Sequence, residues 1–177
     1  VWYYLCPKCH HLSGEFQDTE AFANKVYIED DYAYNYTAKD RENYEKRLNM
    51  IYVPKSQFLV DSLKKDNMDL SEIDLLDDGA GSGYFVRAMR KLGAKAEGIE
   101  ISRAQVEFAN KMAGEDILTQ VDSEAIADVL KKTDKNVISA IGVLEHIINL
   151  DEILDTIQEN RNIRYLFLSV PMFSFSA

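Results

Sequence analysis

Cysteine is almost absent from this sequence, and its scarcity excludes a fold held together by disulfides. Only two cysteines occur, Cys6 and Cys9, and they are too close and too few to build a disulfide framework. Their spacing instead fits one side of a metal knuckle or a redox pair. We therefore expect the protein to work in a reducing compartment, for which the cytoplasm is the simplest choice.

Long apolar runs and an excess of positive charge are also lacking. No apolar stretch approaches the roughly 18 residues of a membrane-spanning helix, and the first residues form no signal-peptide pattern. The formal net charge of −10 repels phosphate backbones. Lysines and arginines gather between Arg41 and Lys65, but acids are interspersed among them, which is typical of a solvated helix face. We therefore expect a small-molecule partner and neither a membrane nor a nucleic acid.

Strand-like and helix-like segments alternate after residue 70. Runs at 73–77, 95–101, 117–121, 137–143 and 164–170 indicate strands, and the segments between them carry apolar residues at helical spacing. Gly93 is expected to end the first of these helices as a C-cap. The alternation predicts an α/β fold with a doubly wound, mostly parallel Rossmann-like sheet. Helices would cover both faces, and ligands would bind at the carboxyl ends of the strands.

The segment before the sheet has a different character, and we divide the chain into residues 1–69 and 70–177. Residues 40–66 are expected to be helical, with Pro54 opening a second helix. The packed stripe of that helix is expected to comprise Phe58, Leu59, Ser62 and Leu63. The last expected strand ends just before Pro171, near the end of the chain. We therefore expect the C-terminal part of the fold to lie outside this sequence.

A glycine-rich turn follows the first strand of the predicted sheet and opens the next helix. It reads Leu-Asp-Asp-Gly-Ala-Gly-Ser-Gly over residues 76–83. Glycines permit a tight turn and let a ligand approach bare backbone, and the following helix offers N–H groups to an anion. A plain βα turn is the alternative. The dinucleotide fingerprint G-x-G-x-x-G needs its third glycine at position 84, which is Tyr84 here, so a nicotinamide cofactor is disfavoured.

Polar residues follow each of the next three strands. Glu100 ends the second strand, where an acid accepts hydrogen bonds from ribose hydroxyls or favours the N-terminus of the following helix. Asp122 follows the third strand and would accept from an adenine amino group or cap the next helix. His146 follows the fourth strand and would act as a general base or order its loop.

Jointly, these motifs resemble the class I S-adenosylmethionine-dependent methyltransferase superfamily. The resemblance covers about residues 70–171 and includes Gly-Ile-Glu-Ile-Ser at 98–102 and Val-Leu-Glu-His-Ile at 143–147. It is greatest to small-molecule methyltransferases whose fourth strand ends in V-L-E-H. The predicted cofactor-binding residues are Asp77, Gly79, Ala80, Gly81, Gly83, Glu100, Ile101 and Asp122. Asp78 replaces the family's usual apolar residue, and it either suits the sulfonium charge or points to solvent.

The Cys-Pro-Lys-Cys segment at residues 6–9 is similar to the zinc segment that precedes the catalytic fold in several sugar-modifying methyltransferases. Two thiolates at this spacing hold one side of a tetrahedral zinc. Cys6 and Cys9 are therefore candidate zinc ligands, with His10 or His11 as additional candidates. A tetrahedral site needs a second ligand pair, and the sequence makes none visible.

The resemblance implies methyl transfer from S-adenosylmethionine to a small-molecule acceptor, for which a sugar or nucleotide sugar is one candidate. His146 is the candidate catalytic base for the acceptor's proton. Tyr34 or Tyr36 would face the substrate, or would pack the helical segment. The alternative from another functional class is a binding or assembly module that keeps the methyltransferase fold without catalysis.

Overall fold

The computed structural model describes residues 2–10, 12–14, 19, 21–22, 25–26 and 40–170. In this part, the strands are β1 (Tyr3–Leu5), β2 (Leu12–Gly14), β3 (Asp74–Asp78), β4 (Lys95–Glu100), β5 (Leu118–Gln120), β6 (Val137–Ile141) and β7 (Tyr165–Ser169). The α-helices are α3 (Arg41–Arg47), α4 (Val53–Lys65), α5 (Tyr84–Leu92), α6 (Arg103–Ala113), α7 (Ile126–Lys132) and α8 (Leu150–Glu159). Shorter helical turns are η2 (Leu48–Tyr52), η3 (Leu70–Glu72), η4 (Ser123–Ala125) and η5 (Leu144–His146).

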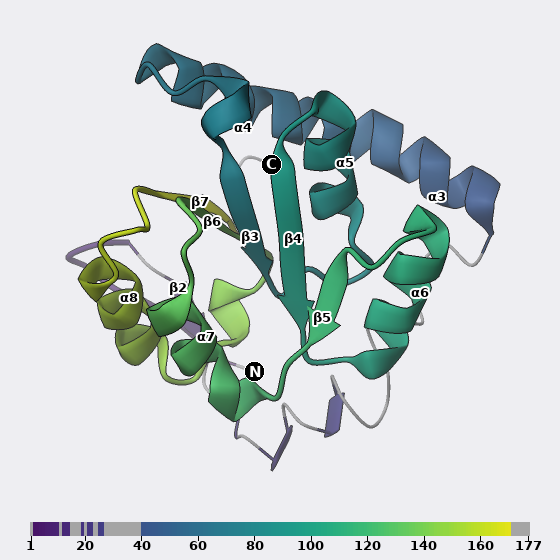
Figure 1. Cartoon of the computed structure of the whole chain (residues 1–177). Coiled ribbons are helices and arrows are strands. Elements are labelled where there is room, and N and C mark those ends of the chain that lie inside the picture. Colours follow the sequence, from purple (N-terminus) through teal and green to yellow (C-terminus); the bar gives the residue numbers. More distant parts are fainter. Residues whose placement is uncertain are drawn as a thin grey trace, which may run out of the picture.

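The strands from β3 to β7 form one parallel sheet in the order β5-β4-β3-β6-β7 (Figure 1). The chain runs from β3 outward to β4 and β5, and then crosses back to β6 and β7 on the other side of β3. The register places Asp77 beside Gly98 on β4 and beside Ser139 on β6. This order confirms the predicted doubly wound α/β sheet, and such sheets bind ligands where the winding direction reverses, here between β3 and β6.

Helices cover both faces of the sheet (Figure 1). On one face, an apolar cluster joins α4 and α5 to β3; it includes Leu59, Leu63, Leu75, Phe85 and Met89. On the other face, a second cluster joins α7 and α8 to the sheet; it comprises Leu76, Ile99, Leu130, Ile138, Ile153 and Ile157. Successive residues of a strand point to opposite faces, so the two clusters take alternate residues of β3. Helix α4 shares a core with the sheet, and the division of the chain near residue 70 stays a prediction.

The helical segment before the sheet runs from α3 through η2 into α4. Pro54 lies in the first turn of α4, as predicted. Because proline has no N–H, it cannot bond back to the preceding turn. The residues before it form a π-helical turn, in which the N–H of Val53 donates to the carbonyl of Leu48. None of the helices in the described residues is both long and apolar enough to cross a membrane.

The predicted packed stripe of α4 is wrong in part. Phe58 is 64% exposed, and Ser62 is only half-buried. The buried residues of this helix are Ser56, Leu59 and Leu63. Their spacings of three and four place them on one face of the helix, whereas Phe58 and Ser62 lie one position away from that face.

Candidate functional site

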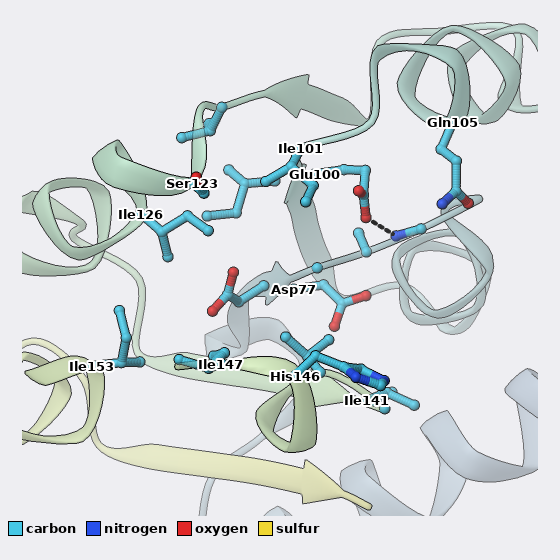
Figure 2. A pocket seen from close by; sticks show the side chains of 18 of the residues that line it. Asp77, Glu100, Ile101, Gln105, Ser123, Ile126, Ile141, His146, Ile147 and Ile153 are labelled. Carbon is cyan, nitrogen blue, oxygen red and sulfur yellow. Dashed lines mark hydrogen bonds between the residues drawn. The ribbon is translucent and has the colours of Figure 1, made fainter. Parts of the chain in front are cut away.

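A cavity of about 630 Å³ lies at the carboxyl ends of the central strands (Figure 2). Asp78 lines it at the end of β3, Glu100 at the end of β4 and Ile141 at the end of β6. The sheet thus places the cavity where doubly wound folds bind their ligands, and its volume lies in the range of small-molecule sites.

The glycine-rich turn between β3 and α5 forms one wall of this cavity. Gly79, Ala80 and Gly81 line it. The N–H of Ala80 donates to the carbonyl of Ile99 over 3.0 Å, which ties the turn to β4. Gly83 is not among the lining residues; it precedes α5, and a side chain there would meet Ala109 on α6. The turn therefore brings most of the predicted glycine motif to the cavity and uses its last glycine for helix packing.

Gly98 allows that turn to pack closely against β4, a role that the sequence alone did not reveal. A Cβ at Gly98 would lie 2.6 Å from the Cβ of Ala80 and 2.7 Å from Leu118. Only a residue without a side chain lets the turn approach β4 this closely. The available signal was a glycine inside a strand, which often marks a close backbone approach.

Gly98→Ala is accordingly expected to lower the free energy of unfolding by about 1–3 kcal/mol, because the added methyl group overpacks the contact with Ala80. Urea denaturation measures this loss. Lys95→Ala, at an exposed position of the same strand, is the control and should change stability by about 0.5 kcal/mol or less. Equal stabilities of the two variants would contradict the tight contact.

Glu100 is oriented by two backbone groups. Its Oε2 accepts from the N–H of Gly81 over 2.7 Å (dashed in Figure 2), and its Oε1 accepts from the N–H of Ser102 over 2.9 Å. Burial raises the pKa of Glu100, while these backbone donors oppose the shift. A carboxylate oxygen accepts more than one hydrogen bond, so both oxygens keep capacity for hydroxyl donors of a ligand in the cavity.

Asp77 and Asp78 bring two more carboxyl groups to the end of β3. Asp77 accepts a hydrogen bond from the Oγ of Ser139 over 2.6 Å. Burial, with smaller contributions from neighbouring carboxylates, raises the pKa of Asp77 to about 7 and that of Asp78 to about 6. Asp78 is 2% exposed, so it does not point to solvent, which was one of its two interpretations.

The buried carboxyl of Asp77 makes the stability of the unliganded protein depend on pH. Its pKa is about 7 in the folded protein and about 3.9 in an unfolded chain. The folded state therefore binds this proton more tightly. The resulting stability is fully present below about pH 4 and is lost as the pH rises through about 7.

Asp77→Asn cannot ionise, and its amide oxygen can still accept from Ser139. We therefore expect the unfolding free energy of the variant, relative to that of the wild type, to increase by about 2–3 kcal/mol between about pH 5 and about pH 8. Urea denaturation of both proteins at the two pH values measures this difference. A gain that is the same at both values would mean that Asp77 is already ionised at about pH 5 in the folded protein, so that burial does not raise its pKa.

His146 faces the cavity from the loop after β6. It ends the short turn η5, and its N–H donates to the carbonyl of Val143 over 2.8 Å. Val143 and His146 line the cavity, and the intervening Glu145 is exposed and does not. Figure 2 shows His146 and Ile147 on the opposite side of the cavity from Glu100. The strand order thus places His146, the candidate base, and Glu100, the candidate acceptor for ribose hydroxyls, in one cavity.

Asp122 lies beside the cavity and does not line it. It is exposed, and its carboxylate is 3.5 Å from the side-chain nitrogen of Gln120. It occupies the N-cap position of η4 without making a side-chain capping bond. Ser123 and Glu124 line the cavity in its place, together with Ile126 and Ala127 of α7. Ile101, predicted as a cofactor contact, lines the cavity near them (Figure 2).

Aromatic and cationic side chains form the remaining wall, and sequence analysis missed them. Arg47 and Tyr52, at either end of the π-helical turn η2, line the cavity with Tyr84 of α5. The rings of Tyr52 and Tyr84 stack with centroids 4.9 Å apart, and the guanidinium of Arg47 lies 5.4 Å from the centroid of Tyr84. π-Helical turns are frequent at functional sites. No contiguous motif marks these residues, because they come from two helices.

The cysteine knuckle lies in the turn between β1 and β2. Both thiols are free, Cys6 half-buried and Cys9 exposed. The N–H groups of Cys9 and Lys8 donate to the sulfur of Cys6 and lower its pKa. Within the described residues, no three His, Cys, Asp or Glu side chains gather closely enough to hold a metal ion. His11, Tyr34 and Tyr36 lie outside the described residues.

A family model and several solved structures are similar to this chain. A family model described as a methyltransferase domain matches residues 44–175. The magnesium protoporphyrin IX methyltransferase of Synechocystis, solved with S-adenosylhomocysteine, has a TM-score of 0.54 at 16% identity, over 81% of this chain and 68% of that one. A plantazolicin methyltransferase, solved with a desmethylplantazolicin analogue and S-adenosylhomocysteine, has a TM-score of 0.56 at 16% identity, over 84% of this chain and 53% of that one.

A search of curated protein sequences finds no match to this chain. At the identities of the two solved structures, the likeness concerns the fold. The family model, in contrast, spans the helical segment from Tyr44 and the whole parallel sheet. The chain therefore belongs to the methyltransferase domain family and has the α/β fold of the class I S-adenosylmethionine-dependent methyltransferases.

Proposed function

We propose that this protein binds S-adenosylmethionine in the cavity at the ends of β3 and β4 and transfers its methyl group to a small-molecule acceptor. One observation carries the proposal. Glu100 is buried at the end of β4, and its carboxylate bonds the N–H of Gly81, so the acid and the glycine turn form a single wall of the cavity. The two solved relatives described above were determined with S-adenosylhomocysteine, the product of such a transfer.

Most of the predicted cofactor residues have a part in this proposal. Glu100 accepts from the two ribose hydroxyls, and the turn at Gly79–Gly81 leaves room for the methionine part. Ile101 and the apolar residues of α7 contact the adenine. Asp122 stays a proposed acceptor for the adenine amino group, and a small movement of its exposed side chain would suffice to reach it. Gly83 acts indirectly, through the packing of α5 on α6.

The cofactor supplies a methyl group that its positive sulfur already activates. The protein mainly has to hold the acceptor atom in line with that methyl group, and positioning of this kind contributes several kcal/mol. A hydroxyl or an acidic carbon must also lose its proton, and His146 is proposed to accept it, because an imidazole is a base near neutral pH. Arg47 and Tyr52, which line the cavity from the helical segment before the sheet, are proposed to contact the acceptor.

The acceptor is proposed to be a sugar or a nucleotide sugar. Two sequence features support this class: the Val-Leu-Glu-His segment at 143–146 is similar to small-molecule methyltransferases, and the cysteine knuckle is similar to the zinc segment of sugar-modifying methyltransferases. A sugar hydroxyl needs a base, which agrees with a histidine on the cavity wall. By their names, the two relatives act on a magnesium porphyrin and on plantazolicin, so the shared fold leaves the acceptor open.

Zinc at the cysteine knuckle is a separate proposal. The N–H groups that donate to the Cys6 sulfur stabilise a thiolate, which is the form that binds zinc. Cys6 and Cys9 would hold one side of the ion. We expect about one zinc per chain in full-length protein purified without chelator, and metal analysis by mass spectrometry measures it. A content near zero in folded protein would leave the two cysteines as a simple turn.

Melting curves with and without ligand test the proposed cofactor. A ligand at 100 times its Kd stabilises the native state by about 2.7 kcal/mol, so S-adenosylhomocysteine is expected to raise Tm by roughly 5–10 °C. Consumption of S-adenosylmethionine with a panel of nucleotide sugars then tests turnover. No change in Tm at millimolar ligand would contradict the proposed site, and binding without turnover on any acceptor would favour the assembly module.

A further inference from the structure

Asp78 stands out among the residues of the cavity because its carboxylate faces an apolar layer. Residues 76 and 78 of β3 point to the same face of the sheet, since side chains alternate along a strand. Leu76 belongs to the apolar cluster under α7 and α8, with Ile99 and Ile153. Asp78 therefore lies on the face that these isoleucines cover, and both of them line the cavity beside it.

Asp78 also has no partner among the described residues. It is 2% exposed, and no described residue donates a hydrogen bond to its carboxylate or pairs with it as a cation. The other two buried acids of the cavity do have hydrogen-bond donors: Ser139 donates to Asp77, and two backbone N–H groups donate to Glu100. A buried carboxylate without a partner destabilises the empty protein.

A ligand that enters the cavity can supply a partner for this carboxylate, because Asp78 lines it. Arg47 is the only lysine or arginine that lines the cavity in the described part of the chain, and its guanidinium lies over the ring of Tyr84. Five acidic side chains line the cavity, three of them buried, and among the described lining residues the only other basic side chain is His146 on the opposite wall. Such an interior favours a ligand with a positive charge over a neutral one of the same shape.

We propose that Asp78 selects for the charge of the sulfonium, so that the site holds S-adenosylmethionine more tightly than its product. This inference rests on the proposed function. In the transfer, the acceptor forms a bond to the methyl carbon, the bond between sulfur and methyl breaks, and its electron pair stays on sulfur. The sulfonium becomes a neutral thioether. Asp78 loses its counter-charge at that moment, which favours release of S-adenosylhomocysteine.

Calorimetric titration with S-adenosylmethionine and with S-adenosylhomocysteine tests this selectivity through the ratio of the two Kd values. The measurement is made at about pH 8, because the pKa of Asp78 is about 6 and the carboxyl is then charged. Asp78→Asn keeps the shape of the side chain and removes its charge. We expect the variant to lower the preference for S-adenosylmethionine about tenfold, mainly by weakening that ligand.

Asp74→Asn is the matched control, since it removes the same charge from the same strand outside the cavity, where Asp74 pairs with Lys135 over 3.0 Å. Its ratio should equal that of the wild type. An unchanged ratio in Asp78→Asn would overturn the inference, including the case in which both ligands weaken equally because Asp78 bonds a group that they share. If wild-type protein binds neither ligand, the proposed function itself fails, which is a distinguishable result.

Discussion

His146→Ala is expected to lower the rate of methyl transfer about 10²–10⁴-fold, the usual range for a general base. His146 lines the cavity from the loop after β6, across from Glu100, where an acceptor and a cofactor would meet. Cofactor affinity should stay nearly normal, because the glycine turn and Glu100 are unchanged. Single-turnover rates at saturating cofactor measure the effect, and the wild-type pH profile should contain a basic limb that the variant lacks.

Two variants sharpen this test. Glu145→Gln changes the exposed neighbour that does not line the cavity, and it should keep its rate. His146→Gln keeps a side chain that forms hydrogen bonds but cannot accept the proton, so it should be as slow as His146→Ala. Turnover close to that of the wild type in His146→Gln would assign the histidine to ordering its loop. Loss of cofactor binding in both His146 variants would assign it to the shape of the pocket.

Glu100→Ala is expected to weaken binding of S-adenosylhomocysteine roughly 10- to 150-fold, which corresponds to about 1.5–3 kcal/mol for hydrogen bonds to a charged group. The substitution removes the acceptor for the ribose and also the acceptor for the N–H of Gly81, so the turn loses one of its attachments to β4. Calorimetry with purified, folded variant measures the change in Kd.

The control for Glu100 is Glu97→Ala on the same strand. Glu97 is exposed and pairs with Lys135 over 3.2 Å, outside the cavity. The control should bind S-adenosylhomocysteine like the wild type. If Glu100→Ala binds as tightly as Glu97→Ala, Glu100 does not contact the ligand, and its burial would serve only the backbone of the turn.

The sheet was predictable because each of its elements has a local signal. The apolar runs before Gly79 and before Gly142 mark β3 and β6, and the helical spacing after Gly83 marks α5. The wrong stripe on α4 shows the limit of this reasoning. Phe58 is apolar but exposed, and Ser56 is polar but buried. Which face of a helix is covered depends on what packs against it, and that is decided by residues far along the chain.

Local sequence motifs likewise marked one side of the cavity and not the other. The glycine turn and Glu100 are contiguous motifs at strand ends, so the sequence indicated both. Arg47 and Tyr52 come from the segment before the sheet, and only the packing of that segment on α5 brings them to the cavity. The contact of Gly98 with Ala80 likewise joins residues that are distant in the sequence. Packing of this kind leaves little trace in a single sequence.

The central claim is that the cavity at the ends of β3 and β4 is a site for S-adenosylmethionine and not for a dinucleotide. Titration of the wild-type protein with S-adenosylhomocysteine, repeated in the presence of millimolar NAD, tests it most directly. We predict saturable binding of S-adenosylhomocysteine with an affinity that NAD does not change, because the turn has Tyr84 where the dinucleotide fingerprint needs its third glycine. Micromolar binding of NAD that competes with S-adenosylhomocysteine would contradict the assignment.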